Sequence, residues 1–309
     1  MLDEKNQIIY EHLLANARFP VKKLSKIINC SQATIINRIE KLEKESYISR
    51  YDAIINWQKL PFIKKIYHIK INDNDFSFFE KQKYAFSIIN LAGLYNFQIW
   101  CFFKTDEQCL SFEKLLKKFD YFSIEIKKLE FPRVSFFHKP VKLSIPKIME
   151  KEIIPDNIDV KIMKYLAQGG ARDSLLKIAE KLNIKYDTVH YRFNKLLSSG
   201  YFLRLVAQPG ENISTLQTTV LYIKIRNNNL EKIYNKISKI DQIISIAQTK
   251  EDGILIHFNS LDFNNYQNKL NEIFLTERRE EIEIVLLSHW KKIYLNNRYP
   301  LELLLEDRS

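Results

Sequence analysis

The chain has 309 residues, of which 48 are basic and 37 acidic, so its formal net charge is +11 (48 − 37). Apolar residues make up 46% and aromatic residues 13% of the chain, which excludes a disordered or low-complexity protein. Because there are only 6 glycines, a phosphate-binding enzyme built on a glycine-rich loop is not expected. The basic balance favours a polyanionic partner.

The three cysteines, Cys30, Cys101 and Cys109, lack the spacing of a disulfide framework or a metal knuckle. No signal peptide is recognised, and no stretch approaches the ~18–20 apolar residues of a membrane span. The six histidines fall in separate elements without the spacing of a metal site. We therefore expect a cytoplasmic protein with no cofactor, no metal, no membrane partner and no catalytic residues.

An internal repeat organises the chain. Residues 18–50 align with residues 172–204 without a gap, at an offset of 154 (172 − 18). Upstream, the match continues after one inserted residue and pairs Asp3 with Asp156. Coincidences of residue type and spacing over this length indicate a tandem duplication.

Each copy predicts three helices followed by a strand hairpin. In the first copy, apolar residues at helical spacing predict helices over residues 8–14 and 21–28. Ser31 is a good N-cap for a third helix, which ends near Ser46, and a β-like stretch follows at residues 50–55. Three helices and a hairpin are typical of a winged helix-turn-helix.

A second pattern follows each of these units, in the order strand, helix, strand, strand, helix, strand. In the first copy we expect strands over 66–71, 86–91, 97–103 and 122–129, with helices over 76–84 and 110–119. In the second copy we expect strands over 220–225, 243–248, 254–258 and 282–287, with helices over 230–237 and 263–274. This order is ferredoxin-like. The predicted fold class is therefore α+β, with two repeats that each join a winged helix-turn-helix to a ferredoxin-like βαββαβ domain.

These patterns divide the chain into six segments. They are a first winged helix (1–60), a first ferredoxin-like domain (61–131), a linker with several prolines and lysines (132–154), a second winged helix (155–212), a second ferredoxin-like domain (213–289) and a C-terminal extension (290–309).

The first copy contains Leu2-Asp3, Asn16-Ala17-Arg18 and the pattern S-x-x-T-I-x-x-R-I-x-x-L from Ser31 to Leu42. With these motifs it resembles the Lrp/AsnC family of leucine- and asparagine-responsive regulators. The resemblance implies that the βαββαβ domain is a RAM domain, an ACT-like module that dimerises and can bind amino acids. It also implies a sequence-specific transcription regulator that binds double-stranded DNA.

Because the chain carries two copies, we expect an intramolecular pseudo-dimer. Its two RAM-like halves would pair sheet against sheet, and it would present two recognition helices to successive major grooves. Further homo-oligomerisation through the RAM-like domains is an open alternative.

Two polar stripes predict the DNA-binding residues. Thr34, Arg38 and Lys41 lie at i, i+4 and i+7 on the third helix. Such side chains suit base edges and phosphates in a major groove. The full predicted set is Ser31, Gln32, Thr34, Asn37, Arg38 and Lys41, with Lys185, Tyr186, Thr188, His190, Tyr191, Arg192 and Lys195 in the second copy. A solvated helix face is the alternative, and either arginine could instead pair with an acid of its own domain.

The segment Gly93-Leu94-Tyr95-Asn96 lies where the resemblance places the RAM effector loop. Gly93, Tyr95 and Asn96 are therefore candidate ligands for an amino-acid-like effector. Leu94 and Asn96 replace the acids usual in that loop, which makes it a weak partner for an ammonium group, and an ordinary hairpin turn is the alternative.

Two other functions remain open. Siroheme decarboxylases also pair winged-helix with RAM-like domains, and Tyr95-Asn96-Phe97-x-x-Trp100 resembles one of their segments. However, Leu91-Ala92-Gly93 stands where a histidine and an arginine are expected. The third function is a winged-helix adaptor that binds proteins of the transcription or chromatin machinery. The leading interpretation is a DNA-binding regulator that is not an enzyme.

Overall fold

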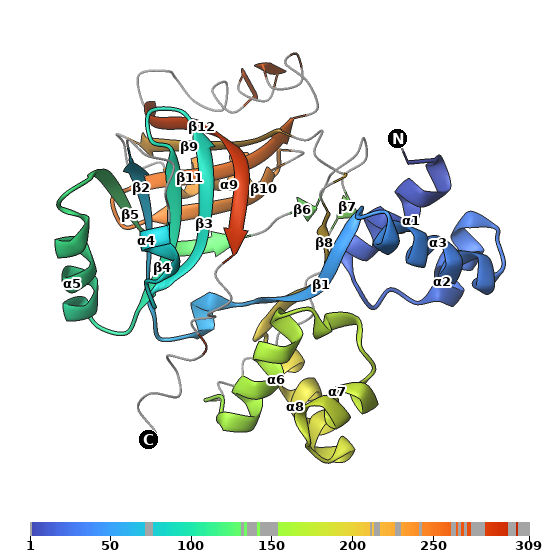
Figure 1. Cartoon of the computed structure of the whole chain (residues 1–309). Coiled ribbons are helices and arrows are strands. Elements are labelled where there is room, and N and C mark those ends of the chain that lie inside the picture. The colour runs from blue at the N-terminus through green and yellow to red at the C-terminus, as the bar shows by residue number, and fades with distance from the viewer. Residues whose placement is uncertain are drawn as a thin grey trace. The chain divides into compact units, whose positions relative to one another are not determined.

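The computed structural model describes residues 2–71, 77–130, 133–134, 141–142, 154–210, 212, 217–225, 230–240, 243–260, 264, 267–268, 271–272, 282–295 and 301. The chain forms two compact units, and each unit takes segments from both halves of the sequence (Figure 1). The first unit comprises Met1–Leu60, Val134–Ser214 and Leu304–Ser309. The second comprises Pro61–Arg133 and Thr215–Leu303.

The first unit contains two triads of helices, each followed by one strand. They are α1 (Glu4–Ala15), α2 (Val21–Ile28), α3 (Gln32–Lys44) and β1 (Ile48–Ile55), and then α6 (Asn157–Ala167), α7 (Leu175–Leu182), α8 (Tyr186–Ser198) and β8 (Phe202–Pro209). The bounds of α2, α3 and β1 recur in α7, α8 and β8 at the offset of 154 seen in the sequence (175 − 21). The repeat thus has the same local structure twice.

Each triad has its own apolar core, which the helical spacing predicts. The residues of this core are at most 6% exposed and comprise Ile9, Leu13, Leu24, Ile35, Ile39 and Leu42 in the first triad, and Ile162, Leu166, Ile178, Val189, Phe193 and Leu196 in the second. Burial of such side chains contributes ~1.5–3 kcal/mol each. It also orients α3 and α8, because the buried face of each helix fixes which face remains exposed.

The strands β1 and β8 pair with each other in an antiparallel two-stranded sheet. This corrects the expectation of a hairpin inside each copy, since each triad supplies one strand and finds its partner in the other triad. Asp52 lies opposite Val206, its own counterpart at the offset of 154 (206 − 52). The pairing is therefore centred on a local two-fold relation between the triads.

Two arginines join the triads reciprocally. Arg18 Nε donates to the carbonyl oxygen of Ala171 at 2.7 Å, and Arg172 Nη1 donates to that of Ala17 at 2.7 Å. Arg18 also lies over the Phe193 ring, 4.9 Å from its centroid. These are charge-assisted bonds to buried backbone acceptors, so they hold the two triads together.

The second unit is a closed antiparallel barrel (Figure 1). Its strands are β2 (Ile63–Lys70), β3 (Ala85–Ala92), β4 (Phe97–Phe103), β5 (Asp120–Glu130), β9 (Gln217–Ile225), β10 (Ile243–Thr249), β11 (Gly253–Ser260) and β12 (Ile282–Leu295). Its described helices are α4 (Ser77–Glu80), α5 (Asp106–Leu116) and α9 (Leu230–Ile237). The order β10-β11-β9-β12-β3-β4-β2-β5 contains the ferredoxin-like order once in each half.

The two halves of the barrel join edge to edge within the chain, through β5 with β10 and β3 with β12. The expectation of sheets packed face against face is thus wrong in its geometry, because pairing of the edges satisfies backbone groups that would otherwise remain open. β12 is longer than the predicted strand 282–287, since its first part pairs with β9 and its second with β3.

Three predicted segments lie mostly outside the described residues. They are the linker 132–154, the helix over 263–274 and the C-terminal extension 290–309.

Candidate nucleic-acid interface

The first helix-turn-helix comprises α2, a tight turn and α3. Asn29 ends α2 in a left-handed conformation (φ 54°), and the Ser31 side chain caps α3 by accepting from the backbone N–H of Thr34. Because Ile35, Ile39 and Leu42 face the core, the opposite face of α3 is exposed. That face carries Gln32, Ala33, Ile36, Asn37, Glu40 and Lys41.

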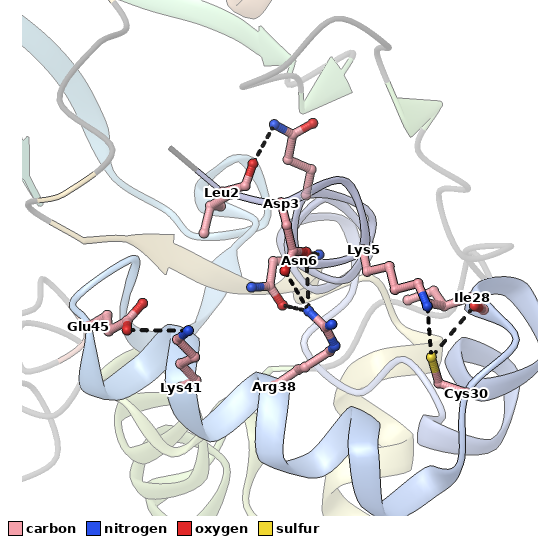
Figure 2. Close-up of polar contacts among 10 residues, drawn as sticks. Leu2, Asp3, Lys5, Asn6, Ile28, Cys30, Arg38, Lys41 and Glu45 are labelled. Carbon is pink, nitrogen blue, oxygen red and sulfur yellow. Dashed lines mark hydrogen bonds and ion pairs between the residues drawn. The ribbon is translucent and has the colours of Figure 1, made fainter.

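The side chain of Arg38 points toward the beginning of α1 (Figure 2). Its Nη1 donates to Asp3 Oδ2 at 2.9 Å and to Asn6 Oδ1 at 2.9 Å. Asp3 also caps α1, since its Oδ1 accepts from the Asn6 N–H at 2.7 Å. The hydrogen bond from Arg38 holds the pKa of Asp3 below its usual value. Arg38 therefore has a role within its own domain, and its predicted contact with DNA remains a prediction.

The second triad repeats this arrangement with more charge. Arg192 Nη1 donates to carboxylate oxygens of Asp156 and Asp159, the latter at 3.1 Å. Lys195 Nζ lies 3.5 Å from the same Asp159 carboxylate. Two basic residues of the predicted stripe on α8 are thus paired with acids of α6 and its N-cap.

The other predicted residues differ in exposure. On α3, Lys41 is exposed, with Glu45 3.7 Å away (Figure 2), and Ser31, Gln32, Thr34 and Asn37 are also exposed. On α8, Lys185, Tyr186, His190 and Tyr191 are exposed, whereas Thr188 is only partly so. The rings of Tyr186 and His190 stack with their centroids 6.0 Å apart. Each recognition helix thus presents the residues of its N-terminal half, the part that contacts bases in helix-turn-helix proteins.

Three exposed lysines on α2, namely Lys22, Lys23 and Lys26, lie beside α3 in the sequence of elements but are absent from the predicted set. The first helix of a helix-turn-helix crosses the DNA backbone, so cations at this position suit phosphate contacts. Their spacing on one side of an eight-residue amphipathic helix was a sufficient signal.

The candidate effector loop joins β3 to β4. Asn96 Oδ1 accepts from the Ile71 N–H at 2.8 Å, and Asn96 Nδ2 donates to the Ile71 carbonyl at 2.7 Å. The amide of Asn96 therefore holds the end of β2, which is a structural role. Gly93 is exposed and Tyr95 half-buried. Binding of an effector by Gly93, Tyr95 and Asn96 remains a prediction.

The barrel brings together two histidines that are far apart in the sequence. His68 of β2 and His257 of β11 are buried, and burial lowers the pKa of each to about 3. Ser245 Oγ lies 2.8 Å from His257 Nδ1, and Gln98 Nε2 lies 3.4 Å from His257 Nε2. Neither ring nitrogen of His68 has a hydrogen-bond partner among the described residues. No sequence spacing links these residues, so this cluster was not predicted.

Apolar side chains of both halves adjoin the two histidines, since the ring centroids of Phe122 and His68, and those of Trp100 and His257, each lie 6.0 Å apart. They include Ile66, Ile89, Leu91, Ile124, Ile126, Val220, Tyr222, Ala247 and Leu255, with Trp100 and Phe122 packed against them.

Among the described residues, no three histidine, cysteine or acidic side chains gather as a metal site would require. In the same part of the chain, no helix has the length and apolar character needed to cross a membrane.

Comparison with known proteins identifies the class of the first domain. Residues 2–43 match the family model of the AsnC-type helix-turn-helix domain. Residues 2–43 are therefore similar to an AsnC-type helix-turn-helix domain, and the predicted resemblance to Lrp/AsnC regulators is confirmed.

Similar proteins include archaeal regulators. The chain is 30% identical over 95 residues to the HTH-type transcriptional regulator Ptr1 of Methanocaldococcus jannaschii, a match over 30% of this chain and 64% of that one. It is 34% identical over 62 residues to the HTH-type transcriptional regulator LrpA of Pyrococcus abyssi, over 20% of this chain and 44% of that one. The matched regions thus span less than two thirds of these relatives.

One similar structure matches nearly the whole chain. The siroheme decarboxylase NirDL, in complex with an iron-uroporphyrin III analogue, matches with a TM-score of 0.59 and 10% identity, over 99% of both chains. At this identity the likeness concerns the fold. The expectation that the chain is not an enzyme is nevertheless overturned, because the fold that it shares over its length is that of an enzyme.

Proposed function

We propose that the protein is a transcription regulator that binds double-stranded DNA through its two helix-turn-helix segments, α2–α3 and α7–α8. The observation that carries the proposal is the exposed face of α3 beside the exposed lysines of α2, within the domain that matches the AsnC-type family. The helix would enter a major groove while the lysines contact phosphates. This function places the protein in the cytoplasm, in contact with the chromosome.

The two-fold relation between the triads supports binding as a pseudo-dimer. Since β1 and β8 pair inside the chain, one molecule carries two recognition helices. The two helices differ in sequence, so their half-sites would also differ. Binding of a small effector at the RAM-like loop, and further homo-oligomerisation, belong to the same proposal and rest on the family resemblance alone.

A titration of the full-length protein with duplex DNA at several salt concentrations tests this function. Genomic fragments selected by footprinting serve as probes. The matched variant replaces Lys22, Lys23 and Lys26 of α2 with alanine, and we expect the dependence of log affinity on log salt to flatten by up to about 2.7 units, ~0.9 for each lost phosphate contact. Failure of the wild-type protein to bind any duplex at low salt would contradict the proposal and favour the protein-binding adaptor.

A second candidate function is favoured by one observation, the match of fold to NirDL over 99% of both chains. A siroheme-decarboxylase-like activity would need the barrel to accommodate a tetrapyrrole beside His68 and His257. The apolar side chains beside these histidines would have to make room for the macrocycle. An absorbance titration with iron-uroporphyrin III decides between them, since a shift of the tetrapyrrole spectrum with a defined stoichiometry would favour the enzyme.

A further inference from the structure

The two triads differ at one buried position that faces the recognition helix. Asn6 of α1 and Asp159 of α6 are counterparts at an offset of 153 (159 − 6), the offset of the segment before the inserted residue. Both are buried, with 5% and 0% of their surface exposed. Both accept a hydrogen bond from the recognition-helix arginine, Asn6 from Arg38 at 2.9 Å and Asp159 from Arg192 at 3.1 Å.

This difference of one charge changes the environment of the lysine one turn further along the recognition helix. Lys195 is directed to the Asp159 carboxylate at 3.5 Å, and its side chain is 25% exposed. At the equivalent buried position the first triad has the neutral Asn6 in place of that carboxylate, and the side chain of its counterpart lysine, Lys41, is 60% exposed. Lys41 forms an ion pair with the exposed Glu45 at the C-cap of α3, and its charge also helps to lower the pKa of Asp3, the acid that Arg38 binds.

The Lys41–Glu45 and Lys195–Asp159 ion pairs differ in how easily they separate. An exposed i, i+4 pair gains little in water and separates easily, so Lys41 can exchange Glu45 for a phosphate. A buried carboxylate cannot move into solvent, and removal of its cation would leave an uncompensated charge. Lys195 and Arg192 are therefore retained by their own domain.

We propose that this position determines which recognition helix offers cations to the DNA backbone. Because Asn6 is neutral, Lys41 remains available, and the first helix-turn-helix provides the salt-dependent part of the affinity through contacts of Lys41 and the α2 lysines with phosphates. With Asp159, the basic side chains of α8 are neutralised, and this helix contributes mainly through its exposed aromatic side chains. The inference rests on the proposed binding of DNA and goes beyond it, because it assigns different physical roles to the two halves.

The surface of the second helix-turn-helix agrees with this division. Tyr191 is 63% exposed at the position of Asn37, and Leu176 and Glu180 of α7 replace Lys22 and Lys26 of α2. A tyrosine or leucine can contact thymine methyl groups or sugars, which adds affinity without release of counterions.

An exchange of the two buried residues tests the proposal. In Asp159→Asn, the second triad acquires the amide of the first, Arg192 retains Asp156, and Lys195 is released. We expect the slope of log affinity against log salt to steepen by about 0.9 unit, which is about a 3.5-fold larger loss of affinity between about 50 and about 200 mM salt. In Asn6→Asp, Lys41 is drawn to the new carboxylate, and the slope should flatten by about the same amount.

A pair of lysine variants keeps the test valid if a buried substitution impairs folding. Lys41→Met and Lys195→Met retain the aliphatic stem, and circular dichroism confirms that each variant folds. We expect Lys41→Met to flatten the salt slope by about 0.9 unit and Lys195→Met to leave it unchanged. Equal effects of the two lysine variants, or unchanged slopes in both folded exchange variants, would overturn the proposal. Absence of duplex binding by the wild-type protein is a different result, which refutes the proposed function itself.

Discussion

At the scale of single residues, the buried histidines have a consequence for stability. In the unfolded chain a histidine has a pKa of about 6.5, whereas burial lowers the pKa of His68 and His257 to about 3. Between these two values the unfolded state binds more protons, so the free energy of unfolding falls as the pH falls. Each histidine contributes a slope of at most about 1.4 kcal/mol per pH unit.

We expect His68→Leu to reduce this loss of stability at low pH. The variant retains His257, so about half of the contribution of the pair should disappear. Urea unfolding at several pH values from about 4 to about 7.5 measures the change. A wild-type slope that persists in the variant would show that His68 is not buried in its neutral form.

Asp52, at the centre of the β1–β8 sheet, has the opposite dependence. Burial raises its pKa to about 6, in spite of Arg50, whose Nε donates to Oδ2 at 2.8 Å. The folded state therefore binds more protons between about pH 4 and pH 6, and the contribution of this group to stability falls as the pH rises through that range.

We expect Asp52→Asn to stabilise the protein at pH 7 by about 1–3 kcal/mol, because the amide removes the cost of an ionised buried carboxyl. Near pH 4 the carboxyl is protonated in the folded state, so the gain should nearly vanish. Thermal unfolding at the two pH values measures the difference. If Asp52→Asn stabilised the protein equally at both pH values, the cause would be a change in packing and not the ionisation of Asp52.

At the scale of elements, the two recognition helices differ in how they begin. The Ser31 side chain caps α3, whereas Lys185 stands at the N-cap of α8 and forms no cap with its side chain. A cation at this end also opposes the helix dipole. We expect Lys185→Ser to raise the free energy of unfolding by about 0.5–1 kcal/mol and Ser31→Ala to lower it by a similar amount. Urea unfolding of both variants, compared with the wild type, is the measurement.

The helices and strands could be predicted closely from the sequence. The apolar periodicity of Ile35, Ile39 and Leu42 and the cap at Ser31 are local signals, and they located α3 within two residues of its ends. The strand 97–103 and the helix 230–237 have the predicted bounds. Such signals work because each element buries one face of fixed period.

The partners of these elements could not be predicted in the same way. The sequence predicts β1 and β8 as parts of two separate hairpins, because the residues of a strand do not indicate a partner strand about 150 residues away. A pairing of Arg38 with an acid of its own domain was left open, but that acid could not be named from the sequence, because Asp3 lies 35 residues away and meets Arg38 only in the folded triad. The same holds for His68 and His257, which lie on strands of different halves.

At the scale of the molecule, the reciprocal bonds of Arg18 and Arg172 imply that the two triads unfold together. We expect Arg18→Ala to weaken both, since it removes the bond to Ala171 and the contact with the Phe193 ring. Amide hydrogen exchange should show protection falling in α7 and α8 as well as in α2 and α3. Loss of protection confined to the first triad would show that the triads are independent. Lys22→Ala, an exposed substitution nearby, is the control.

The pairing of β1 with β8 has a further consequence for how this protein behaves in a cell. In an assembly of separate subunits, the paired form dissociates on dilution and its members can be exchanged for those of a related protein. Here the two strands belong to one covalent chain, so their pairing is unimolecular and independent of concentration. Two unequal helix-turn-helix segments are therefore present in a one-to-one ratio at any expression level, without the exchange of subunits that a dissociating dimer undergoes.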